Sequence, residues 1–242
     1  MAWTATVFTL FPDMFPGTLG TALAGKALAA KQWQLTTVNM RKFGIGPYQR
    51  VDDSPFGGGA GMILKPDVVD AALNSAPKAL GPLLFLSPRG KRLEQSDVKS
   101  YTAERGLRLL CGRYEGVDQR VLDYHQAIEV SLGDYILSGG ELAAMVLLDA
   151  CVRLLPGVMG NHDSDREESF AHNLLEYPQY TRPALWNGRE VPGVLLSGHH
   201  QNIKAWQRNQ AETLTQERRP DLWRRHQRLK KEKRDESSSC DT

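Results

Sequence analysis

Cysteine is scarce in this sequence. Its 242 residues include three cysteines, Cys111, Cys151 and Cys240, which lie far apart and form no Cys-x-x-Cys pair. This spacing argues against a disulfide framework or a zinc cluster and fits free thiols in a reducing compartment. Long apolar runs are also missing, since none reaches the roughly 20 residues that cross a bilayer. Residues 1–11 lack the basic region and the small-residue cleavage site of a secretory signal, so we expect a cytoplasmic protein with no membrane partner.

Two nucleotide-binding signatures are absent as well. No Gly-x-Gly-x-x-Gly run is followed by a ribose-binding acid, and no glycine-rich loop ends in Gly-Lys-Ser or Gly-Lys-Thr. A dinucleotide and a nucleoside triphosphate are therefore poor candidates for a ligand. The net charge of +2 does not indicate a class of partner. The distribution of charge is more informative, because positive charge is concentrated in residues 204–234, with eleven Lys or Arg against four Asp or Glu.

The residues that are present indicate an α/β protein. Hydrophobic residues make up 41% of the chain and charged residues 24%, as in ordinary globular domains. Short apolar runs predict strands at 4–10, 34–40, 83–86, 107–111 and 127–130. Helix-like stretches lie between several of these strands, at 18–30, 66–74 and 96–104. Strands that alternate with helices predict a mostly parallel sheet covered on both faces.

The stretch 141–155 predicts a buried helix. It follows the pair Gly139-Gly140 and stops at Pro156-Gly157. Apolar residues cover most of its circumference, where a surface helix would show a polar face. We expect this helix either deep inside its domain or in a subunit interface.

A change in composition predicts two domains. Residues 1–159 carry the alternating strands and helices. The following residues are polar and charged, and we assign 160–170 to a flexible linker. From 171 to 242 the composition shifts to Trp, Pro, Arg and Gln, which predicts a small helical domain.

Glycine-rich segments follow three predicted strands, at 87–90, 112–116 and 131–140. In open α/β sheets, ligands bind beyond the carboxyl ends of the strands, and glycine allows the backbone to approach a ligand closely. Any one of these segments could be an ordinary tight turn, but the three together predict a site that encloses a nucleoside. A fourth segment, 50–62, contains three consecutive glycines and could either fold over a planar group or connect two elements.

Several motifs resemble those of the bacterial tRNA (guanine-N1)-methyltransferases, in matching order and spacing from residue 5 to about residue 225. They are VDDSPFGGGAGM at 51–62, LSP at 86–88, CGRYEG at 111–116, GDYILSGGEL at 133–142, PGV at 156–158, YTRP at 180–183 and VLLSG at 194–198. These motifs are long and unusual and span nearly the whole chain.

That resemblance implies a homodimer of the trefoil-knotted class, in which a knot at the C-terminal end of the first domain forms the site for S-adenosylmethionine. It implies that the substrate is the guanosine immediately 3′ of the tRNA anticodon, and that magnesium takes part, although no metal-ligand spacing is present in this sequence. Carried over by motif, the cofactor-binding residues are Leu86, Pro88, Gly112, Tyr114, Glu115, Leu132, Gly133, Asp134, Tyr135, Ile136, Leu137, Gly139 and Gly140. The implied substrate-binding residues are Asp52, Gly57, Gly58, Gly59 and Ser169.

Methylation of guanine N1 needs a base and a cation. N1 carries a proton, and its removal places negative charge on O6, so a base near N1 and a donor near O6 are required. By resemblance, Arg153 is the donor. The family's base is an aspartate before a Ser-Phe pair, and Glu168 stands in that place with one more methylene, while Glu167 beside it remains an alternative. Without the motif, Arg153 could simply be favoured by the helix dipole, and Glu168 could be a solvated charge.

Two other functions remain open from the sequence. The chain could be a non-catalytic RNA-binding relative, or a knotted methyltransferase that acts on another RNA, such as ribosomal RNA. The intact catalytic and cofactor motifs favour an enzyme, and the full 50–62 loop favours tRNA as the substrate. Basic and aromatic residues of the C-terminal domain would suit a phosphate backbone and stacked bases, and these are Lys204, Trp206, Arg208, Arg218, Arg219, Trp223, Arg224, Arg225 and Arg228.

Overall fold

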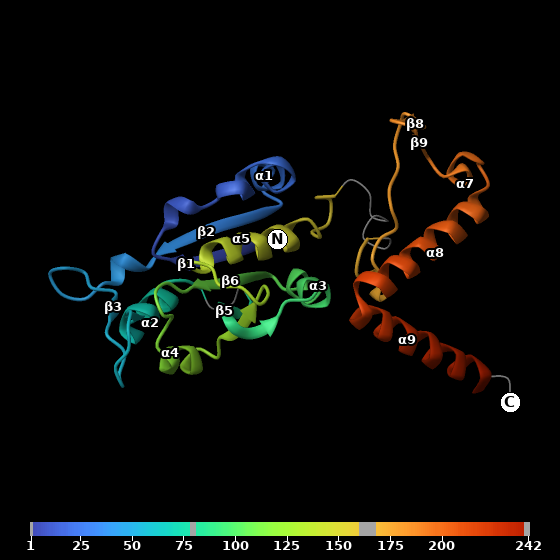
Figure 1. Cartoon of the computed structure of the whole chain (residues 1–242). Coiled ribbons are helices and arrows are strands. Elements are labelled where there is room, and N and C mark those ends of the chain that lie inside the picture. The colour runs from blue at the N-terminus through green and yellow to red at the C-terminus, as the bar shows by residue number, and fades with distance from the viewer. Residues whose placement is uncertain (1, 78–80, 160–167, 240–242) are drawn as a thin grey trace. The chain divides into compact units, whose positions relative to one another are not determined.

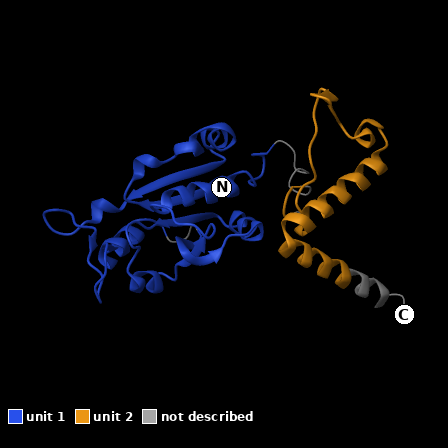
Figure 2. Ribbon diagram, in the orientation of Figure 1, with its two compact units in different colours: residues 1–160 blue, residues 161–242 orange. Residues whose placement is uncertain are grey.

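The computed structural model of the chain describes residues 2–77, 81–159 and 168–239. The chain divides into two compact units, residues 1–160 and residues 161–242 (Figure 2). Most of the segment assigned to the linker, 160–167, lies outside the described residues. Among the helices of the described part, none combines the length and the apolar character needed to cross a membrane.

A parallel sheet forms the centre of unit 1 (Figure 1). Within the described residues it has five strands: β1 (Trp3–Thr9), β2 (Trp33–Asn39), β5 (Leu83–Arg92), β6 (Gly106–Cys111) and β7 (Ile128–Ser131). They lie in the order β2-β1-β6-β5-β7, with every neighbouring pair parallel. The predicted α/β class with a mostly parallel sheet is confirmed, and each strand begins within one residue of its predicted start.

Helices cover both faces of this sheet, as Figure 1 shows. On one face, α1 (Ala22–Ala29), α3 (Gln95–Ala103) and α5 (Gly140–Val152) contribute to one buried cluster. On the other face, α2 (Pro66–Asn74) and α4 (Gln119–Tyr124) contribute to a second cluster. Because successive side chains of a strand point to opposite faces, Leu109 and Leu110 of β6 belong to different clusters. Burial on both faces explains why this strand reads as a nearly continuous apolar run.

Some local features depart from the sequence expectations. The predicted helix 18–30 is divided into a 3-10 turn, Gly17–Gly20, and α1, because Ala22 adopts a left-handed φ of +48° where α1 begins. The strand predicted to end at Leu86 is interrupted there and pairs with β7 again at Lys91 and Arg92, so β5 reaches Arg92. A short antiparallel pair, β3 (Asp52–Asp53) and β4 (Ile63–Leu64), escaped prediction because two-residue strands are too short for an alternating pattern.

Helix α5 is buried over most of its surface, as its apolar composition predicts. Leu147, Leu148 and Cys151 are fully buried. In contrast, Leu142 and Val146 remain 51% and 55% exposed in the single chain. Residues four apart on a helix share a face, so α5 presents an apolar stripe at the surface of unit 1.

Unit 2 is largely helical in its described part. A hairpin of β8 (Leu185–Trp186) and β9 (Arg189–Glu190) is followed by α7 (Gly193–Leu196), α8 (His200–Arg218) and α9 (Pro220–Ser239). The buried side chains of α8 and α9 are Ala211, Thr215, Leu222 and His226 among those that the structure describes. Thr215 and His226 are polar, and buried polar groups require hydrogen-bond partners.

Candidate active site

Residues 87–90 leave the sheet and then return to it. Leu86 and Lys91 both pair with Val130 of β7, so the residues between them form a loop outside the ladder. Gly90 returns so close to β7 that a Cβ atom on it would lie 2.3 Å from the Val130 nitrogen. Only glycine permits that approach. The loop therefore begins at the carboxyl edge of the sheet, where Leu86 pairs with Cys111, the last residue of β6.

The loop after β6 is joined to the end of the glycine-rich segment 50–62. The Glu115 amide donates to the Met62 carbonyl over 2.9 Å, and the Leu64 amide donates to the Gly116 carbonyl over 3.0 Å. Tyr114 turns the chain here with a left-handed φ of +58°. These bonds hold the loop that carries Tyr114 and Glu115 against the start of β4.

The loop after β7 leads into α5 and meets the loop after β6. The Gly140 amide donates to the Gly112 carbonyl over 3.0 Å. A Cβ atom on Gly140 would lie 2.8 Å from the Cα atom of Cys111, so glycine is needed here for helix and strand to pack. A larger side chain at this position would displace α5 before it filled any space meant for a ligand.

A buried ion pair ties these loops together. Arg113 Nε lies 2.9 Å from Glu141 Oε2, and the two side chains are 18% and 1% exposed. Arg113 Nη1 donates to the Ser138 carbonyl over 3.1 Å, and the Thr9 hydroxyl donates to Glu141 Oε1 over 2.7 Å. The pair thus connects the loops after β6 and β7 with the end of β1. A buried carboxylate is stable only when it is paired and hydrogen-bonded in this way.

The three loops enclose a cavity of about 640 Å³. Small-molecule pockets in proteins span roughly 300–1,000 Å³, so the cavity has the size of a ligand site. The cofactor-binding residues expected from the motifs that line it are Leu86, Pro88, Gly112, Tyr114, Glu115, Leu132, Gly133, Tyr135, Ile136, Leu137, Gly139 and Gly140. The remaining expected residue, Asp134, is exposed on the same loop and lies outside this lining.

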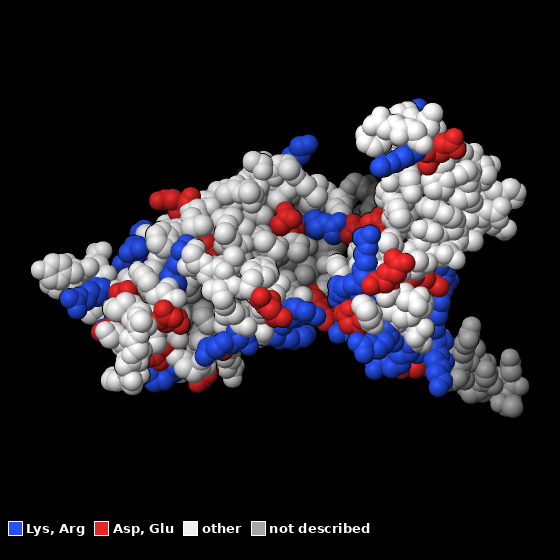
Figure 3. Space-filling model, in the orientation of Figure 1, with Lys and Arg blue, Asp and Glu red and all other residues white. Residues whose placement is uncertain are grey.

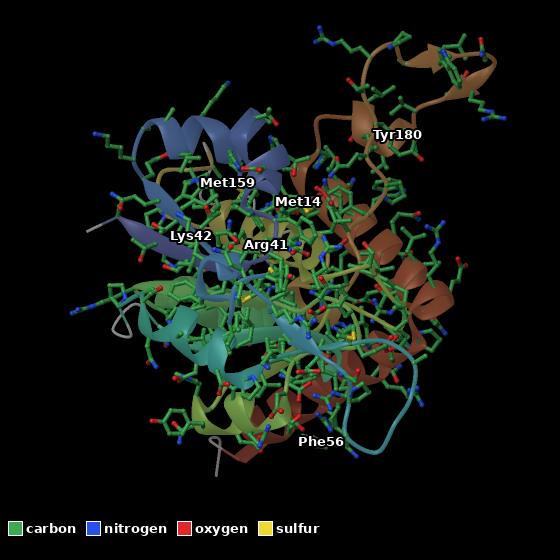
Figure 4. The ribbon with its side chains drawn as sticks, turned by 90° about the vertical axis from the view of Figure 1, so that its left-hand side faces the viewer. Met14, Arg41, Lys42, Phe56, Met159 and Tyr180 are labelled. Atoms are coloured by element: carbon green, nitrogen blue, oxygen red, sulfur yellow. The ribbon has the colours of Figure 1, made fainter. Side chains whose placement is uncertain are left out.

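The expected substrate-binding residues of unit 1 lie beside the cavity and do not line it. Asp52 belongs to β3, and Gly57, Gly58 and Gly59 belong to the exposed loop between β3 and β4. Within the described residues, that loop reaches the cavity through Pro55 and Phe56. The side chain of Phe56 is 99% exposed at this rim (Figure 4).

The two expected catalytic residues belong to different units. Arg153 caps the carboxyl end of α5 in unit 1 and is half-buried. Glu168 belongs to unit 2, where it lines a second cavity of about 530 Å³ beside α8 and α9. Ser169, an expected substrate residue, accepts a hydrogen bond from the Glu176 amide over 3.0 Å. Glu167, the alternative base, lies outside the described residues.

The described part of the chain presents neither a cluster of metal-ligating side chains nor a reactive thiol. No group of three or more His, Cys, Asp or Glu side chains in that part is arranged to hold a metal ion. Cys111 and Cys151 are fully buried. Burial raises the pKa of the Cys111 thiol well above its usual range and that of Cys151 to about 12. Such thiols stay protonated at neutral pH and are poor nucleophiles.

Sequence reasoning assigned no role to Arg113, Glu141 or Phe56. Arg113 and Glu141 lie inside recognised motifs, and Glu141 carries a signal that could have identified it. A carboxylate at the start of an otherwise apolar helix must find a cation when the helix is buried. Phe56 directly precedes three glycines in the 51–62 motif, in which only Asp52 and the glycines have an expected role.

Comparison with known proteins adds independent information on the chain. The family model described as tRNA (Guanine-1)-methyltransferase TrmD matches residues 3–225. The chain is 56% identical over 229 residues to a tRNA (guanine-N(1)-)-methyltransferase of Cereibacter sphaeroides, with 92% of each chain covered. Proteins of the same name are 57% identical in Rhodospirillum rubrum, over 93% of this chain and 95% of the relative, and in Nitrobacter winogradskyi, over 92% and 94%. The chain therefore belongs to the tRNA (guanine-1)-methyltransferase TrmD family.

Proposed function

We propose that this chain is a tRNA (guanine-N1)-methyltransferase that moves a methyl group from S-adenosylmethionine to N1 of the guanosine immediately 3′ of the anticodon. The observation that carries the proposal is the cavity formed where three glycine-rich loops meet at the carboxyl edge of the sheet. The match of the family model from residue 3 to residue 225 supports the reaction and the class of substrate.

S-adenosylmethionine suits the lining of this cavity. Glycines in the loops after β6 and β7 bring the backbone to the cavity wall without a covering side chain, as a ligand with hydrogen-bonding edges requires, while Leu86, Leu132 and Ile136 offer apolar surface. The cofactor, when bound, supplies a methyl group activated by a positively charged sulfur. The protein contributes by binding the two partners and aligning them for transfer.

Arg153 and Glu168 carry the proposed chemistry at the guanine. Glu168 accepts the proton of N1, which converts a poor nucleophile into a good one. Arg153 donates to O6, where the negative charge then accumulates. Arg153 caps the carboxyl end of α5, where the helix dipole favours a cation. Glu168 keeps the carboxylate of the family's aspartate and adds one methylene of reach.

We also propose the trefoil knot and the homodimer for this chain. The excursion of 87–90 from the sheet and the closure of Gly140 on Gly112 support the knot. The exposed stripe of Leu142 and Val146 supports a dimer, because burying apolar surface in a partner is favourable. We propose a cytoplasmic location as well, where a protein that modifies tRNA would meet its substrate. Magnesium is expected only from the resemblance to the family, and the proposed roles of Glu168 and Arg153 do not depend on it.

The basic surface of unit 2 supports tRNA as the partner. Lys and Arg side chains gather on unit 2 where α8 meets α9 and along the described part of α9 (Figure 3). The exposed basic residues of these helices include Lys204, Arg208, Arg218, Arg224, Arg225 and Arg228. Positive charge attracts a phosphate backbone whatever its sequence. We therefore propose that residues 1–159 bind the cofactor and that residues 171–242 bind the tRNA.

Transfer of label from S-adenosylmethionine tests the proposed function. The purified protein should methylate a tRNA transcript with guanosine 3′ of the anticodon, and digestion of the product should yield N1-methylguanosine. A matched transcript with adenosine at that position should stay unlabelled. Labelling of ribosomal RNA in place of tRNA would assign the enzyme to another RNA, and RNA binding without any transfer would indicate a non-catalytic relative.

A further inference from the structure

We propose that Thr215 and His226 are positioning residues that fix Glu168 through the loop 169–175. This inference rests on the proposed function, in which Glu168 is the base. The loop begins directly after Glu168, and it is anchored to α8 by Thr215 and to α9 by His226. The helices of unit 2 therefore hold the backbone of the loop that follows Glu168.

The loop is closed by hydrogen bonds of its own. The Glu176 amide donates to Ser169 Oγ over 3.0 Å, and the Phe170 amide donates to the Leu174 carbonyl over 2.6 Å. His172 and Asn173 adopt left-handed φ values of +54° and +57°. Non-glycine residues hold such conformations when the surrounding contacts outweigh the strain. The residue after Glu168 is thus tied to the far end of the loop.

Thr215 provides the first anchor. Its side chain is fully buried on α8. The hydroxyl donates to the Ala211 carbonyl over 2.6 Å within the helix, and its oxygen accepts the Leu175 amide over 2.8 Å. A hydroxyl inside a helix usually bonds only to its own backbone. Here the same oxygen also satisfies a loop amide that would otherwise be left without a partner.

His226 provides the second anchor from α9. It is 6% exposed, and its ring stacks on Trp223 with centroids 5.6 Å apart and planes 20° apart. Nδ1 lies 2.8 Å from the His172 carbonyl oxygen, and because a carbonyl only accepts, Nδ1 carries the proton and donates. The stack fixes the orientation of the ring and thereby the direction of this bond.

Both anchors hold the loop by polar atoms that packing alone does not require. A valine would fill the space of Thr215, and an apolar ring would fill that of His226. Neither could form the hydrogen bond that the threonine or the histidine makes to loop 169–175. A base must lie within hydrogen-bond reach of the proton it accepts, so a small shift of the loop misplaces Glu168. Misplacement by about 1 Å can slow a reaction on the order of a hundredfold.

Paired variants separate the hydrogen bonds from the bulk of the side chains. Thr215→Val keeps the shape and removes the hydroxyl, whereas Thr215→Ser keeps the hydroxyl. His226→Asn places an amide N–H near the position of Nδ1, whereas His226→Gln places it near Nε2 and leaves the His172 carbonyl without a donor. We expect Thr215→Val and His226→Gln to slow single-turnover methylation on the order of tenfold or more. Thr215→Ser and His226→Asn should stay near the original rate, and cofactor affinity should be unchanged in all four.

A double-mutant cycle with Glu168→Gln tests whether Thr215 acts through the base. If it does, adding Thr215→Val to Glu168→Gln should slow transfer no further, because the group it positions is already gone. Full additivity of the two effects, or equal slowing by Thr215→Ser and Thr215→Val, would overturn the inference. Normal methylation by Glu168→Gln alone would instead overturn the assignment of the base in the proposed function.

Hydrogen exchange gives a readout that does not depend on activity. The Leu175 amide should exchange faster in Thr215→Val than in Thr215→Ser, while amides inside β6 keep their protection in both. Unchanged exchange at Leu175 in Thr215→Val would show that the hydroxyl does not hold the loop, whatever the rates of methylation.

Discussion

The Arg113 guanidinium lies 2.9 Å from the Glu141 carboxylate, and that carboxylate is 1% exposed. Because the pair joins the loops after β6 and β7, Glu141→Gln should weaken both the fold and the cofactor site. Gln keeps the shape of the side chain and leaves Arg113 without its counter-charge. We expect the free energy of unfolding to fall by about 3 kcal/mol, near the lower end for breaking a buried pair because Arg113 is partly exposed. Urea denaturation measures the loss, and calorimetry should show weaker binding of S-adenosylmethionine.

The pair of Arg120 and Asp118 offers a matched control. Its atoms lie 2.8 Å apart, but the Arg120 side chain is 73% exposed. Arg120→Gln should therefore change stability by less than about 1 kcal/mol. Equal losses from Glu141→Gln and Arg120→Gln would mean that the buried pair does not hold the loops together.

Gly140 should tolerate no side chain, because of the close contact between α5 and β6. Gly140→Ala adds a Cβ atom 2.8 Å from the Cys111 Cα, which belongs to the rigid sheet. We expect a loss of roughly 1–3 kcal/mol in the free energy of unfolding, the scale of overpacking. Gly193 is the comparison, since a Cβ atom there meets nothing within 4 Å. In denaturation, Gly193→Ala should have nearly the same free energy of unfolding as the original protein. If Gly140→Ala is equally stable, α5 can move away from β6 without a loss of stability.

The sheet of unit 1 could be predicted from the sequence because each strand carries its own local signal. Strands β5 and β6 are short apolar runs bounded by polar or glycine-rich segments, and burial on both faces gives them that pattern. The break before α1 has no such signal, because a left-handed Ala22 follows from tertiary packing and not from residue type. The return of β5 to β7 after residue 90 depends likewise on pairing with a strand far along the chain.

The candidate site was predictable as separate loops and not as an assembled cavity. Glycines after strands indicate where a ligand can approach, so the segments 112–116 and 131–140 could be selected from the sequence alone. The pairing of Arg113 with Glu141 could not be predicted, because the neighbouring residues in the sequence do not indicate which cation contacts a buried carboxylate. The anchoring of loop 169–175 could not be predicted for a related reason: Thr215 and His226, which we propose hold the loop, lie forty or more residues further along the chain.

Stability should fall in alkaline solution through the Cys151 thiol. Burial raises the pKa of this group from 9.0 to about 12. The folded state thus holds the proton more firmly, which contributes stability that is fully present below pH 9 and is lost as the pH rises toward 12. For this one thiol the loss is about 1.4 kcal/mol per pH unit above pH 9. Denaturation as a function of pH should show a shallower decline for Cys151→Ala, whereas identical slopes would mean that the buried thiol does not contribute.

The exposed stripe on α5 should be part of the dimer interface. Leu142→Arg places a charge where a partner would bury an apolar side chain, and an unpaired charge in an interface is strongly unfavourable. We expect this variant to sediment as a monomer at micromolar concentration, whereas the original protein should sediment as a dimer. Tyr124→Lys is the control, because Tyr124 is 76% exposed on α4, a helix that covers the opposite face of the sheet. A dimeric Leu142→Arg protein would place the interface elsewhere.

The base and the cation can be separated by single substitutions at Glu168 and Arg153. Glu168→Gln removes the proton acceptor, so single-turnover methylation should slow on the order of a hundredfold or more while cofactor affinity stays nearly intact. Glu168→Asp should retain much of the activity, because it restores the family's own residue. Arg153→Lys should be severely impaired, since a compact ammonium cannot reproduce the planar guanidinium.

Glu167→Gln completes this series as the matched control, because it removes the neighbouring carboxylate and should leave the rate nearly unchanged. If Glu167→Gln is slow and Glu168→Gln is normal, the base is the other carboxylate of the pair. If both variants transfer methyl groups at the original rate, neither residue is the base. Glu115 would then be the next candidate, because it is the carboxylate of the 112–116 loop and lines the cofactor cavity. The pH dependence of the rate distinguishes these cases, since loss of the true base should remove the rise in rate on the acid side of the profile.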